Sequence, residues 1–237
     1  MPHIVASFDA ELQKLRTLVV DMGATVVRQL EDATEAFRNR DLALARRVAA
    51  GDKAVDALQR RIEDHVIATI AKRQPLAIDL RETITTLKIA TDLERMGDLA
   101  KNNAKRVIFM SEQGQPIGAG VNLDTLSKRT HEQVSRVMLA YASRNTELAL
   151  EVWESDGEID TLHTALFREL LTYMMEDPRS IGYCTHLLFC SKNLERIGDH
   201  ATNIAENIHY VATGEFLSGD RPKGPNPSNI QPDAPEE

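Results

Sequence analysis

Two acidic motifs of nearly identical sequence are the part of this chain best suited to chemistry. One runs from Asp92 to Asp98 and the other, 101 residues later, from Asn193 to Asp199. Each contains Glu-x-x-x-Asp, formed by Glu94 with Asp98 and by Glu195 with Asp199. A spacing of four places both carboxylates on one face of a helix, where they repel by about 0.2–0.5 kcal/mol. A glycine lies inside each motif and costs about 1 kcal/mol relative to alanine. Two unfavourable choices, made twice in register, indicate a site.

A second acidic pair precedes each motif. Asp52 and Asp56 lie in the first half of the chain, and Asp156 and Asp160 lie in the second. Asp56 is 19 residues before Pro75 and Glu94 is 19 after it, while Asp160 and Glu195 are 18 before and 17 after Pro178. If each proline marks the turn of an antiparallel helical hairpin, the two pairs of each half stand level. Each half is therefore predicted to gather four carboxylates.

Four carboxylates in one place repel unless they are solvated, protonated or balanced by a cation. A metal ion is the simplest balance, and oxygen ligands suit Mg²⁺, Ca²⁺, Mn²⁺ or iron. Asn102 and Asn203 follow the motifs by one turn and could add amide oxygens or hydrogen bonds to the ligands. Two alternatives remain open at this point. The acids could be an ordinary solvated face paired with Arg95 and Arg196, or a metal-free docking surface for a basic partner.

The elements that would position these residues are helices. Apolar residues recur every three or four positions from Leu12 to Phe37, from Val55 to Thr69 and from Ile84 to Val107. The glycine-rich stretch 114–120 predicts a linker, after which helices are expected at about 122–143, 146–176 and 177–213. The fold class is therefore all-α, with two tandem three-helix bundles at 1–115 and 116–217. Polar, proline-rich residues 218–237 are expected to form a disordered tail.

Composition narrows the class of protein. The formal net charge of −8 over 237 residues argues against nucleic-acid binding, which needs a cationic surface. No apolar run approaches the ~20 residues of a membrane span, and the N-terminus lacks an export signal. Cys184 and Cys190 match neither a redox motif nor a disulfide framework. These features favour a cytoplasmic protein that reaches a membrane only indirectly.

Other motifs are weaker. Glu206-x-x-His209 matches half of a di-iron bundle motif, and Asp160-x-x-His163 resembles it loosely. The first repeat has Lys105 and Ile108 where Glu206 and His209 would stand. No phosphate-binding glycine loop, dinucleotide fingerprint or nucleophile elbow is present, so no catalytic residue is predicted.

The motifs, their order and their duplication resemble the PhoU family of bacterial phosphate-signalling proteins over residues 7–215. The resemblance rests on both acidic motifs, on Gln74-Pro75 to Arg81 and on the segment from Glu11 to Gly23. It implies two three-helix bundles whose acidic motifs bind iron or zinc clusters. It supports Glu94, Asp98, Glu195 and Asp199 as ligands, whereas the other four acids rest on the hairpin geometry.

The resemblance further implies a function without catalysis. The expected protein is a homodimeric adaptor that represses the phosphate-starvation response. It would connect the ATPase subunit of the phosphate ABC transporter to a sensor histidine kinase. Two other hypotheses remain: a carboxylate-bridged di-iron enzyme of ferritin-like chemistry, which would require Glu206 and His209, and a metal-free helical adaptor.

Overall fold

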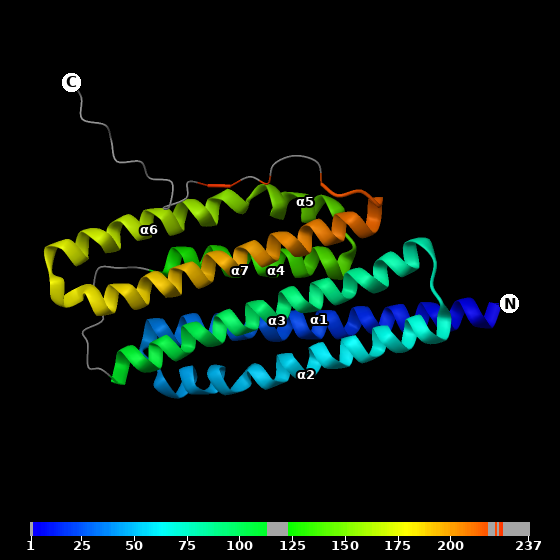
Figure 1. The fold of residues 1–237 in the computed structure, drawn as a ribbon, viewed down its shortest axis with the longest axis horizontal. Coiled ribbons are helices and arrows are strands. Elements are labelled where there is room, and N and C mark those ends of the chain that lie inside the picture. Colours follow the sequence, from blue (N-terminus) through cyan, green and yellow to red (C-terminus); the bar gives the residue numbers. More distant parts are fainter. Residues whose placement is uncertain (1, 113–122, 218–220, 222, 225–237) are drawn as a thin grey trace, which may run out of the picture.

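In the part of the chain that the structure describes, seven α-helices and one short 3₁₀ helix form two bundles. A computed structural model describes residues 2–112, 123–217, 221, 223 and 224. The first bundle contains α1 (Pro2–Asn39), α2 (Leu42–Arg73) and α3 (Ala77–Glu112). The second contains α4 (Asp124–Ser143), α5 (Thr146–Glu154), α6 (Asp156–Glu176), η1 (Pro178–Ser180) and α7 (Ile181–Thr213). Because α5 and α6 follow one another in place of a single helix, the two predicted three-helix bundles are confirmed (Figure 1).

Local sequence signals account for several helix boundaries. The side chain of Asp41 accepts a hydrogen bond from the Leu44 N–H at 2.9 Å at the start of α2. Asn145 caps α5 in the same way through the Leu148 N–H at 3.0 Å. Asp177 accepts from the Arg179 N–H, with Pro178 in the first position of η1, as the Asp-Pro sequence predicts. These caps satisfy backbone donors that a helix start leaves free.

The structure divides two of the predicted helices. The helix expected over 177–213 begins as η1, and α7 starts only at Ile181. The helix expected over 146–176 is divided at Ser155, and α6 begins at Asp156. The predicted linker 114–120 and the predicted boundary between residues 115 and 116 lie outside the described residues. Those two features stay predictions.

Helices α3 and α7 lie side by side at the centre of the molecule and join the two bundles (Figure 1). They run antiparallel, because Asp92 contacts His200 at 2.9 Å while Asn103 accepts a hydrogen bond from Asn193 at 2.8 Å. Buried side chains from both bundles, including Leu93 of α3, form one continuous core. The two repeats therefore share a core and form a single packed unit.

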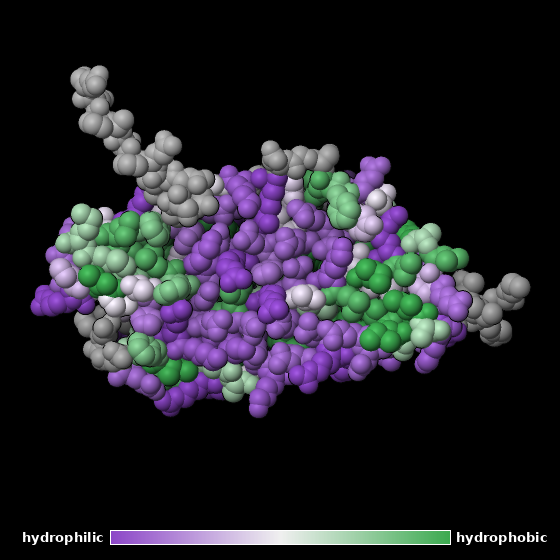
Figure 2. Space-filling model, in the orientation of Figure 1, coloured by the Kyte–Doolittle hydropathy of each residue, from purple (hydrophilic) through white to green (hydrophobic). Residues whose placement is uncertain are grey.

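The polar and apolar surfaces are separated along the long axis. Figure 2 shows polar side chains over the middle of one face and apolar side chains gathered toward both ends. Exposed apolar residues occur at the α2–α3 turn, including Leu76 and Ile78, and at the α6–α7 turn, including Met175 and Ile181. These two turns lie at opposite ends of the molecule (Figure 1). Among the described helices, none has both the length and the apolarity that crossing a bilayer requires.

Candidate functional site

The four acids of the first repeat come together, as the hairpin geometry predicts. Asp52 and Asp56 lie on α2, and Glu94 and Asp98 lie on α3; these four residues are called the first cluster. Lys101 lies one turn after Asp98 and bridges the two helices. Its Nζ donates to Asp98 Oδ1 at 2.6 Å and also to Asp52 Oδ2. Asp52 and Asp98 are therefore within reach of one cation.

The electrostatics of the first cluster reflect this crowding. Burial raises the pKa of Glu94, and the neighbouring Asp98, Asp56 and Asp52 raise it further, while Arg95 opposes the shift. Arg95 reaches Glu94 at 3.4 Å, but its own side chain is largely exposed. Burial lowers the pKa of Lys101, but hydrogen bonds to Asp52 and Asp98 outweigh this and raise it above its ordinary value. The cluster thus favours a positive charge at its centre.

The second repeat builds the equivalent group from α6 and α7. Asp156, Asp160, Glu195 and Asp199 are called the second cluster. Its central cation is Arg221, from the C-terminal segment. The Arg221 guanidinium donates to both carboxylate oxygens of Asp156, at 2.7 and 2.8 Å, and to Asp199 Oδ1 at 2.8 Å. Both repeats therefore place one basic side chain between an acid of the middle helix and an acid of the last helix.

Charge in the second cluster is only partly balanced. Burial raises the pKa of Asp199, and Glu195 and Asp156 add to the rise while Arg221 opposes it. Burial also raises the pKa of Asp160, against a hydrogen bond from the Gly224 N–H. Glu195 pairs through Oε1 with Lys192 at 2.7 Å, while its buried Oε2 has no hydrogen-bond partner among the described residues. One carboxylate oxygen is thus left for a further donor or cation.

The glycines of the two motifs bring the helices together. A Cβ atom at Gly97 would lie 3.4 Å from Val55 of α2, and one at Gly198 would lie 2.9 Å from Ile159 of α6. Val55 and Ile159 each lie beside an acid of the middle helix. The glycines therefore allow the close helix contact that sets the acids of each repeat level with one another.

The two asparagines of the motifs have different surroundings. Asn102 is exposed, whereas Asn203 is half-buried and donates to Asp92 Oδ1 at 3.3 Å. The Asn203 amide oxygen accepts from Arg221 at 3.5 Å. Asn203 thus links the second cluster to α3, and the predicted role of both asparagines as ligands stays a prediction.

The two histidines of the weaker motifs, His209 and His163, do not join either cluster. Glu206 accepts a hydrogen bond from the Trp153 indole at 3.0 Å, and His209 lies against the Glu215 carbonyl oxygen at 3.2 Å. His163 is buried and contacts Ser191. Within the described part of the chain, no three carboxylate, imidazole or thiol groups are arranged to hold a metal ion with the side chains as they stand. Lys101 and Arg221 instead separate the central carboxylates.

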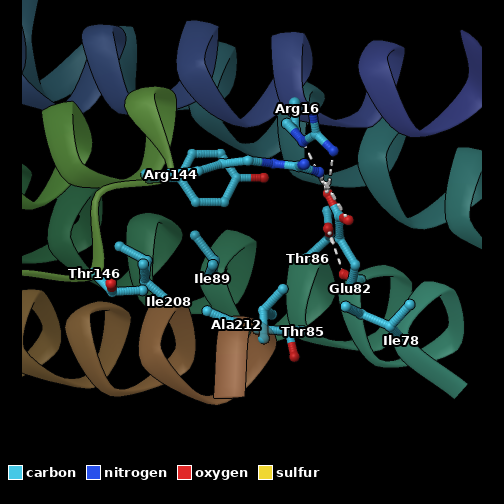
Figure 3. A pocket seen from close by; sticks show the side chains of 12 residues that line it. Arg16, Ile78, Glu82, Thr85, Thr86, Ile89, Arg144, Thr146, Ile208 and Ala212 are labelled. Atoms are coloured by element: carbon cyan, nitrogen blue, oxygen red, sulfur yellow. Dashed lines mark hydrogen bonds and ion pairs between the residues drawn. The ribbon is translucent and has the colours of Figure 1, made fainter. Parts of the chain in front are cut away.

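A separate cavity lies between the two bundles. It has a volume of about 210 Å³, and Figure 3 shows Arg16 and Arg144 pointing toward Glu82 at one side of it. Arg16 Nη2 is 2.7 Å from Glu82 Oε1, and Arg144 Nη2 is 3.0 Å from each Glu82 oxygen. The group joins α1, α3 and the end of α4, so it connects the two halves away from both clusters.

The fold and the paired clusters define a class: a duplicated all-α protein with one acidic site in each repeat. A family model described as the PhoU domain matches residues 19–107 and 123–208. The chain belongs to the PhoU family, which is a family of accessory and regulatory proteins and not of enzymes. The prediction of a protein without catalytic activity is confirmed, and the di-iron enzyme hypothesis loses its support.

Named relatives and solved structures agree with this assignment. The chain is 52% identical over 221 residues, 93% of each chain, to the phosphate-specific transport system accessory protein PhoU homolog of Rhizobium meliloti (strain 1021). It is 39% identical over 214 residues, 90% of this chain and 88% of the other, to the phosphate-specific transport system accessory protein PhoU of Escherichia coli (strain K12). The crystal structure of PhoU from Pseudomonas aeruginosa is 37% identical and matches with a TM-score of 0.84, covering 88% of this chain and all of that one.

Sequence reasoning did not identify the two cations. The spacing of Lys101 could have indicated its role, because it lies three residues after Asp98 and so on the same helix face. No such spacing marks Arg221, since it lies in a segment for which disorder was predicted. Arg221, Lys223 and Gly224 are among the described residues, the rest of 218–237 lies outside them, and the disordered tail stays a prediction.

Proposed function

We propose that this protein is a cytoplasmic accessory protein of a phosphate-specific transport system and a negative regulator of the phosphate-starvation response. It would act as an adaptor between the transporter ATPase subunit and a sensor histidine kinase, and would reach the membrane only through these partners. The observation that carries the proposal is PhoU family membership across both repeats. The printed names of the relatives, which describe phosphate-specific transport accessory proteins, support the transport connection.

Two surface features support adaptor function. The exposed apolar residues at the α2–α3 and α6–α7 turns lie at opposite ends of the molecule, so two partners could bind without overlap. Contiguous exposed apolar surface commonly marks protein contacts.

Both cysteines are free and buried, which suits a reducing compartment. A homodimer remains part of this proposal.

We also propose that each cluster binds a metal ion or metal cluster. Iron and zinc follow from the family resemblance, and manganese, magnesium or calcium from the oxygen ligands. The residues fit such a group: each site offers four carboxylates and is partly accessible, and a Glu195 oxygen is buried without a partner. Occupancy requires that Lys101 or Arg221 move aside, because each now holds the central carboxylates. When bound, the ion would stiffen the contact between the middle and last helices.

The test is made in a bacterium whose own homologue has been deleted. A reporter of the phosphate-starvation response is measured in phosphate-rich medium, with this chain supplied from a plasmid. Wild type should restore repression and should retain the transporter ATPase and the kinase in pull-downs. Leu76→Glu combined with Ile78→Glu should lose at least one partner, because it places charge on one apolar end.

The matched control is Leu139→Glu, which changes an exposed apolar residue on α4. This control should repress as wild type does. Failure of the wild-type chain to restore repression, despite normal abundance, would contradict the regulatory proposal. Full repression by variants with Asp98→Ala and Asp199→Ala would favour a metal-free adaptor.

A further inference from the structure

The two repeats obtain their central cation from different parts of the chain. Position 202 of the second repeat corresponds to position 101 of the first, given the 101-residue offset of the motifs. Lys101 supplies the cation of the first cluster from within α3. Thr202 stands in its place and offers a neutral hydroxyl, which donates to Asp156 Oδ1 at 2.8 Å. The second repeat therefore lacks a built-in cation, and Arg221 fills its position.

Arg221 is bound as a specific ligand. Its Nε and Nη2 form a bidentate pair with Asp156, and Nη2 reaches both the side chain and the backbone carbonyl of Asp199, at 2.8 and 3.3 Å. Asn203 accepts from Nη1 at 3.5 Å. Asp156 is 3% exposed, so this pair is largely withdrawn from water. Bidentate guanidinium–carboxylate pairs of this kind are strong and geometrically selective.

Gly224, three residues after Arg221, contacts α6 through its backbone. The Gly224 N–H donates to Asp160 Oδ2 at 3.0 Å. A Cβ atom at Gly157 would lie 3.2 Å from Gly224 N, and one at Gly224 would lie 2.6 Å from the Gly157 carbonyl oxygen. The two glycines thus allow the backbone of Gly224 to approach α6 closely. The first repeat has Lys53 at the position equivalent to Gly157, by the 104-residue offset of the middle-helix acids.

We propose that Arg221 is an internal, displaceable ligand of the second cluster, which must leave before a metal ion can enter. Arg221 would therefore control metal entry at the second site and leave the first site unaffected. The competition part of this inference rests on the proposed metal binding, whereas the docking of Arg221 does not. A cation bound at Asp156 and Asp199 would take the oxygens that the guanidinium now holds.

The experiment compares the full-length chain with its Arg221→Gln variant. Mn²⁺ binding to each cluster is titrated by electron paramagnetic resonance, with Asp98→Ala or Asp199→Ala added to report one cluster at a time. Hydrogen exchange at Gly224 is followed by mass spectrometry with and without Mn²⁺. Arg179→Gln is the matched control, because Arg179 is exposed and pairs with Asp177 outside both clusters.

The proposal predicts that Arg221→Gln tightens Mn²⁺ binding at the second cluster by about tenfold or more, because charge-assisted hydrogen bonds no longer compete. Binding at the first cluster should not change. Gly224 should be protected from exchange in wild type, and either Mn²⁺ or Arg221→Gln should remove that protection. Arg179→Gln should match wild type in both measurements.

Two results would overturn the proposal. One is equal exchange at Gly224 in wild type and Arg221→Gln, which would show that Arg221 does not hold this part of the chain against the second cluster. The other is Mn²⁺ binding at the first cluster together with unchanged affinity at the second cluster in Arg221→Gln, which would refute competition. Absence of Mn²⁺ binding from both clusters would instead contradict the proposed metal function and the competition with it. Loss of Gly224 protection in Arg221→Gln would then still support the docking of Arg221.

Discussion

In each carboxylate cluster, one basic side chain contacts two of the four acids. Lys101 contacts Asp52 and Asp98, and Arg221 contacts Asp156 and Asp199. Without these cations, half-buried carboxylates would face one another without balance, which is unfavourable. We therefore expect these basic side chains to stabilise the fold, and in the proposed metal-bound state they are the groups that the ion would replace.

Replacing Lys101 with methionine should lower the stability of the first bundle. The change keeps most of the side chain's apolar stem but removes the charge, leaving Asp52 and Asp98 without their donor. The free energy of unfolding should fall by about 1.5–3 kcal/mol, the range for hydrogen bonds to charged groups. Urea unfolding measures this loss, and Mn²⁺ should recover part of it. Lys105→Met, at an exposed position of the same helix, should have almost no effect, and equal losses in the two variants would refute the account.

His163 predicts a pH dependence of stability. Burial lowers the pKa of His163 to about 4, and the nearby Lys192 adds to the shift. Between pH 6.5 and 4 the unfolded chain binds a proton at this residue that the folded chain does not, so stability falls as pH decreases through this range. At pH 5 this proton uptake lowers the free energy of unfolding by roughly 1–2 kcal/mol. His163→Gln should lose less stability than wild type between pH 7 and pH 5 in urea titrations. Identical losses would contradict the shifted pKa.

At the scale of the helices, the sequence predicts where the helices lie and which acids come together. It does not predict the packing role of the two motif glycines. Helical periodicity and the Asp-Pro signal placed the helices, and distances from Pro75 and Pro178 placed the acids level. The sequence places Gly97 and Gly198 inside the acidic motifs, and the structure adds that both are buried and make room for side chains of the middle helix. Periodicity reports which face of a helix is buried, but it does not report how closely two helices approach.

The limits of local sequence patterns also explain why the break at Ser155 and the position of Arg221 are not predicted. The buried positions Val152, Asp156 and Ile159 keep a helical spacing across the break at Ser155, so periodicity alone does not reveal it. The position of Arg221 depends on a contact between the end of the chain and α6, which a local pattern does not encode. A comparison of Lys101 with Thr202 could have indicated that the second cluster lacked its own cation.

Gly198→Ala tests the helix contact directly. The added methyl would lie 2.9 Å from Ile159 Cδ1 and 3.2 Å from Gln133 Oε1, so packing strain opposes the helix-propensity gain of about 1 kcal/mol. We expect a net loss of about 1 kcal/mol, within the range for overpacked cores. Ile159→Val removes the Cδ1 atom and should make Gly198→Ala less harmful in a double-mutant cycle of unfolding free energies. Strictly additive effects would show that this contact is not the cause.

At the scale of the whole molecule, Glu82 holds the two bundles together on one side. It accepts hydrogen bonds from Arg16 of α1 and from Arg144 at the end of α4. Together with the antiparallel contact of α3 and α7, this makes the two repeats one unit.

Glu82→Gln should weaken this connection. The amide keeps the shape of the side chain but loses the charge that pairs with two guanidinium groups. Because Glu82 is only 16% exposed, the loss should be about 1–3 kcal/mol in the free energy of unfolding. Differential scanning calorimetry measures it, with Glu132→Gln, a change in an exposed pair, as the control. No difference between the two variants would contradict the role of Glu82.

We propose that each repeat provides its own carboxylate metal site. The most direct test is elemental analysis of metal per chain for wild type, Asp98→Ala, Asp199→Ala and the double variant, purified without an affinity tag or chelator. Each single variant should lose part of the metal and the double variant nearly all of it, with helicity by circular dichroism unchanged. A wild-type protein that binds no iron, zinc or manganese after reconstitution, or metal content that all variants retain, would contradict the claim.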